Sequence, residues 1–139
     1  MIVADTGGIL ALLDRDDHHH GVVRRLFEEG GETWILPWAI LPEVDYLAST
    51  RLGDAVSRAF VEDLRDGLFA VDGQVHRDLP RAAALLERYA GLRMGLTDAV
   101  VMAQAERHRA KVIVTTDARH FRAVVLDLPT PPRLVPLDP

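Results

Sequence analysis

The sequence predicts an α/β fold, with a mostly parallel sheet covered by helices on both faces in a three-layer α/β/α arrangement. Short apolar segments rich in valine and isoleucine alternate with longer segments of helical character, which is the order of successive strand-helix-strand units. The segment Lys111 to Val114 has the strongest character of a buried parallel strand, because it is short, β-branched and bounded by polar residues. Acidic residues follow strands or begin helices, as expected where ligands gather at the carboxyl edge of such a sheet.

The first half of the chain follows this alternation. Gly7 and Gly8 open the apolar segment of the first predicted helix, and Gly30 stops the second. Pro42 is compatible with a helix only near its first turn, so the third helix should begin close to it. In order, we expect a strand at 2–4, a helix at 9–13, a helix from the polar break at 14–17 to Gly30, a strand at 33–36, a helix that carries Glu43, and a helix at about 54–66.

The second half contains the clearest helix of the chain. Small and branched apolar residues recur from Thr97 to Arg109, and Thr97 is expected to cap this helix with Asp98 in its first turn. In order, we expect a strand at 68–71, helices at 79–89 and 97–109, and a strand at 111–114. The proline-rich residues 129–139 predict an extended C-terminal segment, with Leu134 and Val135 on a sheet edge.

Composition limits the classes of protein to which the chain can belong. With 139 residues, of which 48% are hydrophobic, residues 1–139 have the size of a single domain with its own core. The absence of cysteine excludes disulfides and thiolate sites for zinc or iron-sulfur clusters. No apolar run approaches the roughly 20 residues of a membrane span and no basic leader precedes the first strand, so we expect a cytoplasmic protein. The net charge of −5 argues against a broad basic surface that coats nucleic acid, but it leaves a nuclease open.

Four carboxylates are the main functional feature of the sequence. Asp5 follows the first predicted strand, Asp117 follows the strand at 111–114, and Glu43 and Asp98 stand near helix starts. Residues far apart in sequence converge at the carboxyl edge of a parallel sheet, and converging carboxylates repel one another unless cations or protons neutralise them. The stability of the fold gives no reason to keep such a cluster. Because no cysteine and no paired histidine accompany them, the pattern predicts a metal site made of oxygen ligands.

Each carboxylate also has a purely structural interpretation. Asp5 and Asp98 are placed to cap helix N-termini, and Asp117 is placed to begin a turn or to cap the short segment 118–121. Glu43 is harder to explain in this way, because an unpaired carboxylate among apolar neighbours is costly unless its helix face opens on a polar site. A structural role for all four together is a weaker explanation than for any one of them.

Four short motifs carry a resemblance to a known family. They are V-A-D-T at 3–6, P-E-V-D-Y-L-A at 42–48, G-L-T-D-A-V-V-M-A at 95–103 and V-T-T-D-x-x-H-F at 114–121. In this order and in these structural contexts, they resemble the PIN-domain ribonucleases, and the size and motif order are similar to the VapC-type toxins of toxin-antitoxin pairs. The resemblance covers almost the whole chain, departs at none of the four acidic positions, and implies a PIN-like α/β/α domain.

The resemblance also implies an activity, a cofactor and partners. The residues that would hold Mg²⁺ or Mn²⁺ are Asp5, Glu43, Asp98 and Asp117, with Thr6 and Thr115 or Thr116 as polar neighbours. The protein would then be an endoribonuclease that hydrolyses RNA phosphodiester bonds through a metal-activated water, leaving a 5′-phosphate and a 3′-hydroxyl. A VapB-type antitoxin would cover the acidic cleft with a basic side chain, and apolar helix faces would form a homodimer. The motifs do not specify the RNA target.

Other polar and aromatic residues have weaker functional interpretations. RNA phosphates would be held by one or more arginines near the carboxyl edge, namely Arg15, Arg93, Arg119 and Arg122. The histidine run at 18–20 fits a solvated helix start better than a metal site, because adjacent helical residues do not share a face. We expect Asp45 in solvent, His120 near the rim of the site, and Trp34 and Trp38 in the core or a dimer surface.

Two other functional classes lack residues that they need. A receiver-like phosphorylation domain requires paired acidic residues after the first strand and a late lysine, whereas Asp5 stands alone and the only lysine, Lys111, precedes its strand. A haloacid-dehalogenase-like phosphatase requires a second aspartate two residues past Asp5, where Gly7 stands. The alternative that stays open is a catalytically silent PIN domain that acts as an RNA- or protein-binding regulatory module.

Overall fold

The structure, a computed structural model, describes residues 1–139 and contains one sheet of five strands. In spatial order these are β3 (Ala70–Asp72), β2 (Trp34–Pro37), β1 (Ile2–Ala4), β4 (Val112–Thr115) and β5 (Arg133–Pro136). Every neighbouring pair is parallel, so the carboxyl ends of all five strands lie at one edge. The edge strand β5 contains Leu134 and Val135, as the sequence predicts.

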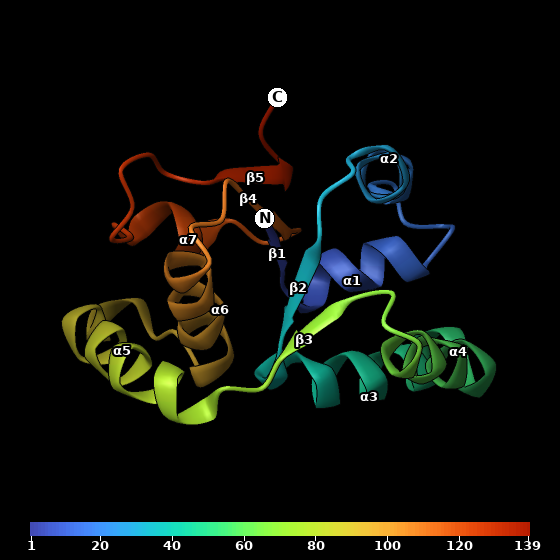
Figure 1. Ribbon diagram of the computed structural model, residues 1–139, viewed down its shortest axis with the longest axis horizontal. Coiled ribbons are helices and arrows are strands. Elements are labelled where there is room, and N and C mark those ends of the chain that lie inside the picture. The colour runs from blue at the N-terminus through green and yellow to red at the C-terminus, as the bar shows by residue number, and fades with distance from the viewer.

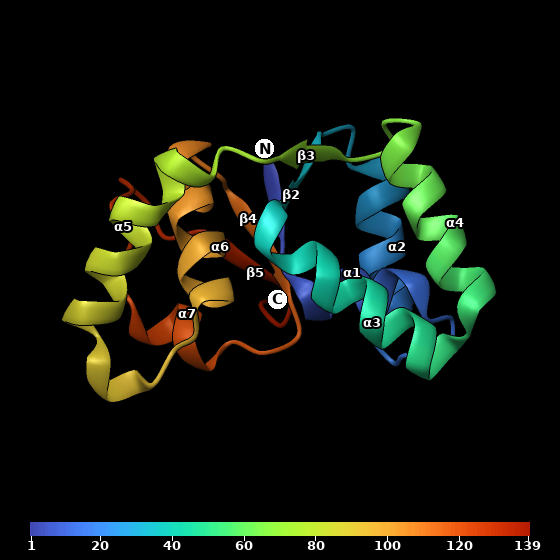
Figure 2. The same cartoon turned by 90° about the horizontal axis from the view of Figure 1, so that it is seen from below.

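Seven α-helices and two short 3-10 helices connect the strands. They are α1 (Thr6–Leu13), α2 (His20–Glu29), η1 (Trp38–Ile40), α3 (Leu41–Leu52), α4 (Asp54–Arg65), α5 (Val75–Arg88), η2 (Ala90–Leu92), α6 (Leu96–Arg107) and α7 (Arg119–Ala123). Helices α1 to α4 lie on one side of the sheet and α5 to α7 on the other (Figures 1 and 2), which confirms the three-layer α/β/α fold. The chain builds outward from β1 to β3 and then crosses to β4 on the other side of β1. The topological switch therefore falls between β1 and β4, where open parallel sheets bind ligands.

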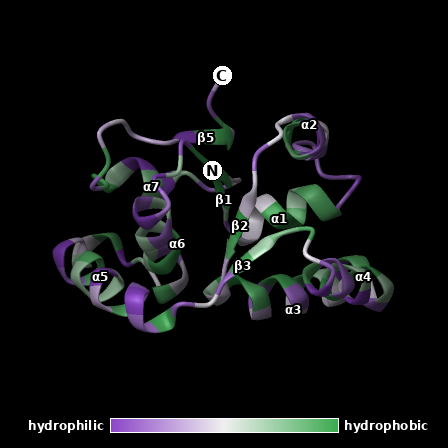
Figure 3. Ribbon diagram, in the orientation of Figure 1, coloured by the Kyte–Doolittle hydropathy of each residue, from purple (hydrophilic) through white to green (hydrophobic).

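The sheet forms the centre of the hydrophobic core. In its register, Val3 of β1 lies between Ile35 of β2 and Ile113 of β4. These side chains are between 0% and 5% exposed, and Figure 3 shows β1 and β2 in the colours of hydrophobic residues. Because helices cover both faces, the strands are continuous apolar runs rather than alternating ones. None of the helices combines the length and the apolar character that a membrane span needs.

Helix α1 begins at Thr6 rather than at Ile9. Asp5 is its N-cap, and the Oδ1 atom of Asp5 accepts a hydrogen bond of 2.8 Å from the backbone N–H of Gly8. This cap allows helical geometry to start at Thr6, so the two glycines lie inside the first turn instead of before it. A Cβ atom at Gly8 would collide with the carbonyl group of Val114 on β4. Gly8 therefore allows close packing of α1 on β4 and does not mark the start of the helix.

Three other helix starts also differ from the prediction. Helix α2 begins at His20 with His19 as N-cap, so the polar break at 14–17 does not cap it. Helix α6 begins at Leu96 with Gly95 as N-cap, and no side chain makes a capping hydrogen bond, so the expected Thr97 cap is wrong. Helix α5 begins at residue 75 instead of residue 79 and contains Pro80. Its first turn is held by a tertiary contact that local propensity does not reveal, because Asp78 bonds side chains of α6.

A buried polar cluster joins β3, α5 and α6. Asp78 is fully buried. Its carboxylate accepts hydrogen bonds from Arg107 at 2.8 Å, Gln104 at 2.8 Å and Trp38 at 2.9 Å. Arg107 also pairs at 2.8 Å with Asp72 at the end of β3. Burial acts to raise the pKa of Asp72, but the hydrogen bonds, above all that from Arg107, outweigh it and lower the pKa to about 2. The cluster fixes the C-terminal half of α6.

Candidate functional site

A cavity at the carboxyl edge of the sheet brings the four predicted carboxylates together. It has a volume of about 340 Å³ and lies where β1 and β4 end, beside the first turns of α1, α3 and α6. None of its nine lining residues is hydrophobic; they are Asp5, Thr6, Gly7, Glu43, Gly95, Thr97, Asp98, Thr116 and Asp117. The four carboxylates come from separate parts of the chain, so the fold, not local sequence, produces their convergence.

Strand ends and helix starts position the four acidic side chains. Asp5 directly follows β1 and caps α1, and Asp117 lies just beyond the end of β4. Glu43 and Asp98 lie in the first turns of α3 and α6. Three helix N-termini therefore meet at the cavity, and their partial positive charges offset part of the repulsion among the carboxylates. The capping role of Asp5 is thus compatible with a place in the cluster.

Asp5 is the most buried of the four carboxylates, with an exposure of 9%. Burial raises the pKa of Asp5 from 3.8 to about 7, and the charges of Asp98 and Asp117 act in the same direction. The side chain of Thr115 and the backbone N–H of Gly8 oppose this rise. In the absence of a cation, Asp5 therefore carries a proton for a large part of the time near neutral pH, and a bound cation would favour its ionised form.

Two of the other carboxylates have partners on α7. The Oδ2 atom of Asp98 lies 2.8 Å from Nδ1 of His120. Asp117 accepts hydrogen bonds from Arg119 through its backbone N–H at 3.2 Å, its Nε at 3.1 Å and its terminal guanidinium nitrogen at 2.9 Å. These hydrogen bonds hold the pKa of Asp117 below its ordinary value. Glu43 is exposed at the edge of the cavity.

Small polar residues occupy the space between the carboxylates. The hydroxyl of Thr6 is buried without a hydrogen-bond partner, so it can bond a group that enters the cavity. The hydroxyl of Thr115 instead bonds the backbone N–H and carbonyl of Asp117, at 3.1 Å in each case, and shapes the turn that carries that residue. Thr116 lines the cavity, and a Cβ atom at Gly7 would collide with its hydroxyl. Gly7 therefore keeps this part of the cavity open.

The side chains of the cavity suit a hard, hydrated divalent cation. All of their polar atoms are carboxylate or hydroxyl oxygens. No three acidic, histidine or cysteine side chains lie close enough to enclose an ion by themselves. Mg²⁺ fits this arrangement, because it keeps several waters and binds proteins through one or two carboxylates together with substrate phosphate oxygens. The unpartnered hydroxyl of Thr6 would offer one more oxygen to the hydration shell of such an ion.

The four arginines suggested for RNA binding lie in different places. Arg119 contacts a carboxylate of the cavity, and Arg93 is an exposed residue with a left-handed backbone (φ 54°) in the turn before α6. Arg122 pairs with Asp138 at 2.8 Å. Arg15 lines a separate cavity between α1, α2 and α4. Of the four, Arg119 is thus the one that contacts the acidic cavity, and Arg93 lies two residues before the cavity-lining Gly95.

The remaining polar and aromatic residues have structural partners. Among the three adjacent histidines, the ring of His20 lies 2.8 Å from a backbone carbonyl of α1, and they form no metal-binding group. Asp45 is exposed and accepts a hydrogen bond of 2.6 Å from Ser57 on α4. Trp34 is buried in the core, and Trp38 donates to the buried polar cluster. None of them lines the acidic cavity.

The sequence interpretation missed the contact between His120 and Asp98, although it placed His120 near the rim. His120 follows Asp117 by three residues, and one turn of α7 directs it toward the first turn of α6. The D-x-x-H spacing after a strand end was the available indication. Gly95 was also missed, because a residue without a side chain gives no chemical indication of lining a cavity.

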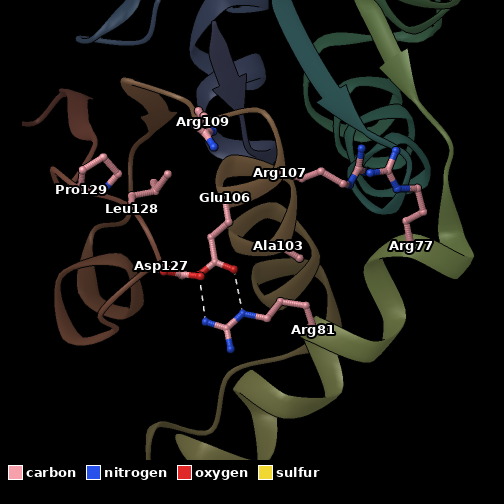
Figure 4. A pocket seen from close by; sticks show the side chains of 9 residues that line it. All are labelled: Arg77, Arg81, Ala103, Glu106, Arg107, Arg109, Asp127, Leu128 and Pro129. Carbon is pink, nitrogen blue, oxygen red and sulfur yellow. Dashed lines mark hydrogen bonds and ion pairs between the residues drawn. The ribbon is translucent and has the colours of Figure 1, made fainter.

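A larger cavity at the opposite end of α6 has a different character. It has a volume of about 460 Å³, and its cationic residues are Arg77, Arg81, Arg107 and Arg109 (Figure 4). Arg81 and Glu106 form two hydrogen bonds, of 2.7 Å and 2.9 Å, that hold α5 against α6. Arg107 belongs to the buried polar cluster. With half of its arginines committed to carboxylates that join the helices, this cavity is part of the framework that supports the acidic site.

Comparison with known proteins identifies the family. The model of the PIN domain matches residues 2–125, a span that contains all four carboxylates. The chain belongs to the PIN-domain family. Ribonuclease VapC26 of Mycobacterium tuberculosis, to which this PIN domain is similar, is 28% identical over 123 residues, which cover 88% of this chain and 91% of the relative.

Solved structures of other proteins share the fold of this PIN domain. The Mycobacterium tuberculosis toxin VapC20, described as cleaving the sarcin-ricin loop, superposes with a TM-score of 0.76 at 19% identity, covering 92% of this chain and 98% of that one. A toxin-antitoxin complex from Klebsiella pneumoniae gives a TM-score of 0.67 at 19% identity, with coverages of 96% and 99%. The DNA-bound VapBC of Salmonella typhimurium gives 0.66 at 21% identity, with coverages of 96% and 95%. At these identities, the likeness establishes the fold.

Proposed function

We propose that this PIN domain is a metal-dependent endoribonuclease. The observation that carries the proposal is the convergence of Asp5, Glu43, Asp98 and Asp117 on one wholly polar cavity at the topological switch of a parallel sheet. The similarity to a protein named as a ribonuclease supports RNA as the substrate class. Burial, together with the charges of the neighbouring carboxylates, raises the pKa of Asp5 to about 7, and a structural role does not explain this cost.

We assign Mg²⁺ or Mn²⁺ to the cavity, with the four carboxylates as its ligands, some directly and the others through bound water. When bound, such an ion neutralises charge on the phosphodiester and lowers the pKa of the attacking water. The residues of the chain hold the ion and the substrate in place: His120 orients the carboxylate of Asp98, and Thr6 offers a buried hydroxyl to the hydration shell. Gly7 leaves room for a phosphate to approach.

The reaction is hydrolysis at phosphorus. A water oxygen forms a bond to phosphorus while the bond from phosphorus to the 3′ oxygen breaks, and the 3′ oxygen takes up a proton. The products are a 5′-phosphate and a 3′-hydroxyl. The ribose 2′ oxygen takes no part, so no cyclic phosphate forms.

We further propose that the protein is the toxin of a toxin-antitoxin pair and consists of a single domain that forms a homodimer. Structures of similar fold are described as toxin-antitoxin complexes, which supports a VapB-type antitoxin as partner. The acidic cavity would accept a basic side chain of that partner, since Asp117 already accepts the guanidinium of Arg119. A purified antitoxin that binds the protein but leaves cleavage intact would contradict this mode of inhibition.

The deciding experiment is cleavage of total cellular RNA with 5′-end mapping, in EDTA and with added Mg²⁺ or Mn²⁺. Asp98→Asn removes one charge from the cavity, and Asp16→Asn makes the same change at an exposed residue of the loop between α1 and α2. We expect discrete, metal-dependent cuts with wild type and Asp16→Asn and none with Asp98→Asn. If wild type binds RNA but cleaves none with either metal, the nuclease proposal is wrong and the protein is a catalytically silent binding module.

A further inference from the structure

Tyr46 is the only aromatic residue of the chain whose side chain is exposed. Its exposure is 66%, whereas every other phenylalanine, tyrosine and tryptophan is buried or half-buried. No other ring packs against it, and the hydrogen bond at this residue, from Thr50, goes to its backbone carbonyl. Single exposed apolar groups are common, so the position of Tyr46, rather than its exposure alone, gives it significance.

Tyr46 lies beside the acidic cavity. It follows Glu43 by three residues on α3, so the two residues are neighbours on the helix surface, about 4.5 Å apart along the axis. Helical side chains lean toward the N-terminus of their helix, so the ring of Tyr46 covers the turn that carries Glu43. The N-terminal end of α3 is the end that faces the cavity. Tyr46 does not line the cavity itself, but this helix geometry places its ring next to Glu43, which does.

The opposite flank of the cavity has an exposed apolar side chain as well. Leu96 begins α6 between the cavity-lining residues Gly95 and Thr97, and its exposure is 47%. The cavity thus has a polar lining, suited to a phosphate and a cation, and two helices that begin beside it carry exposed apolar side chains. A nucleotide has the same division, because its phosphate is charged and its base presents an apolar face several ångströms away.

We propose that Tyr46 is a base-stacking residue that holds a nucleobase next to the scissile phosphate of single-stranded RNA. The inference rests on the proposed ribonuclease function. A base paired within a duplex cannot offer its face to the ring, so the contact selects unpaired RNA. Because every base has such a face, the contact tolerates all four bases and favours purines, which offer the larger surface.

The net charge of the protein favours such a contact. The net charge is −5, and the cavity itself is acidic, so phosphate attraction contributes less here than in a basic nucleic-acid-binding protein. Contacts that do not depend on charge would therefore add to the affinity for RNA. Stacking on an exposed tyrosine is a contact of this kind.

The test measures binding of fluorescein-labelled oligoadenylate and oligouridylate by anisotropy, in an Asp98→Asn background that prevents cleavage. We expect Tyr46→Ala to lower affinity for oligoadenylate by about 5- to 150-fold, the range of one base stack, and for oligouridylate by less. Tyr46→Phe keeps the ring and should bind like the parent. Val22→Ala, a change at an exposed apolar residue of α2, is the matched control and should also bind like the parent.

A second measurement is independent of affinity. RNA that contains 5-iodouridine is irradiated with the protein, and the crosslinked peptide is identified, with Tyr46 as the expected site. The inference is overturned if Tyr46→Ala binds RNA with unchanged affinity and the crosslink forms at another residue. It is also overturned if Tyr46→Ala loses the dimer but not RNA binding, because the ring then belongs to a contact between protein chains. Cleavage of total RNA by wild type tests the nuclease separately, so failure of either proposal is recognised by itself.

Discussion

Replacement of Asp78 by asparagine should destabilise the protein strongly, although the side chain keeps its shape. Asp78 is fully buried, and one carboxylate oxygen accepts from Arg107 while the other accepts from Trp38 and Gln104. All three partners are donors. An asparagine has one acceptor oxygen and one NH₂ group, so in either orientation its NH₂ group faces a donor and leaves a buried group unsatisfied.

The expected loss follows from the partners that remain. Breaking one side of a buried ion pair costs about 3–5 kcal/mol, although Arg107 retains Asp72 as a second partner, which favours the lower end of this range. A buried donor left without an acceptor adds about 1–3 kcal/mol. We therefore expect Asp78→Asn and Asp78→Ala each to lower the free energy of unfolding by about 4 kcal/mol. A domain with about 5–15 kcal/mol of stability remains folded in water, with a clearly lower urea midpoint.

Urea denaturation followed by circular dichroism gives the free energies. Asp16→Asn, which changes an exposed aspartate of the loop after α1, is the control and should stay within about 0.5 kcal/mol of wild type. A loss of less than about 1 kcal/mol in Asp78→Asn would refute the view that this cluster fixes α6.

Three further predictions concern the acidic cavity. The pKa of Asp5 is about 7 in the folded protein against an ordinary 3.8, so ionisation of Asp5 destabilises the fold increasingly as pH rises from about 4 to 7. The variant Asp5→Asn avoids this cost and can still accept the hydrogen bond from Gly8. In urea titrations with EDTA, it should be more stable than wild type by up to about 4 kcal/mol at pH 8 and equally stable near pH 4. His120→Ala should weaken Mn²⁺ binding by about 10- to 100-fold in calorimetry, since His120 orients the carboxylate of Asp98, and unchanged affinity would remove it from the site. Arg119→Gln should leave the urea midpoint unchanged, because the arginine of its ion pair with Asp117 is 79% exposed. If Arg119 also holds an RNA phosphate, the slope of log RNA affinity against log salt concentration should fall by about one in this variant. An unchanged slope would show that Arg119 holds no phosphate.

The parts of the fold that depend on periodicity and strand ends were predictable from the sequence. The sequence predicts a buried parallel strand at Lys111 to Val114, because helices on both faces demand a continuous apolar run, and β4 lies one residue later at each end, at Val112–Thr115. The same reasoning placed Asp5 and Asp117 at the carboxyl edge. Their convergence with Glu43 and Asp98 followed from topology, since carboxyl ends of parallel strands meet at one edge.

The parts that depend on tertiary contacts were not predictable. Gly8 looked like a helix start, but its role is the close approach of α1 to β4, which no local pattern reveals. Thr97 looked like a cap because of its residue type, whereas the helix begins one residue earlier and directs Thr97 into the cavity. Asp78 attracted no notice, because a single aspartate within an amphipathic helix resembles a solvated residue until its partners on α6 are known.

Without a cation, the repulsion within the acidic cavity is reduced in a different way at three of its four carboxylates. Asp5 binds a proton that leaves near pH 7, Asp98 bonds a histidine of α7, and Asp117 accepts the guanidinium of Arg119. A divalent cation that enters the site would therefore replace the proton of Asp5 and the exposed guanidinium of Arg119. The same exchange is open to a basic side chain of a protein partner. An inhibitor of the proposed ribonuclease thus needs to supply at the cavity only the kind of group that Arg119 already supplies from within the chain.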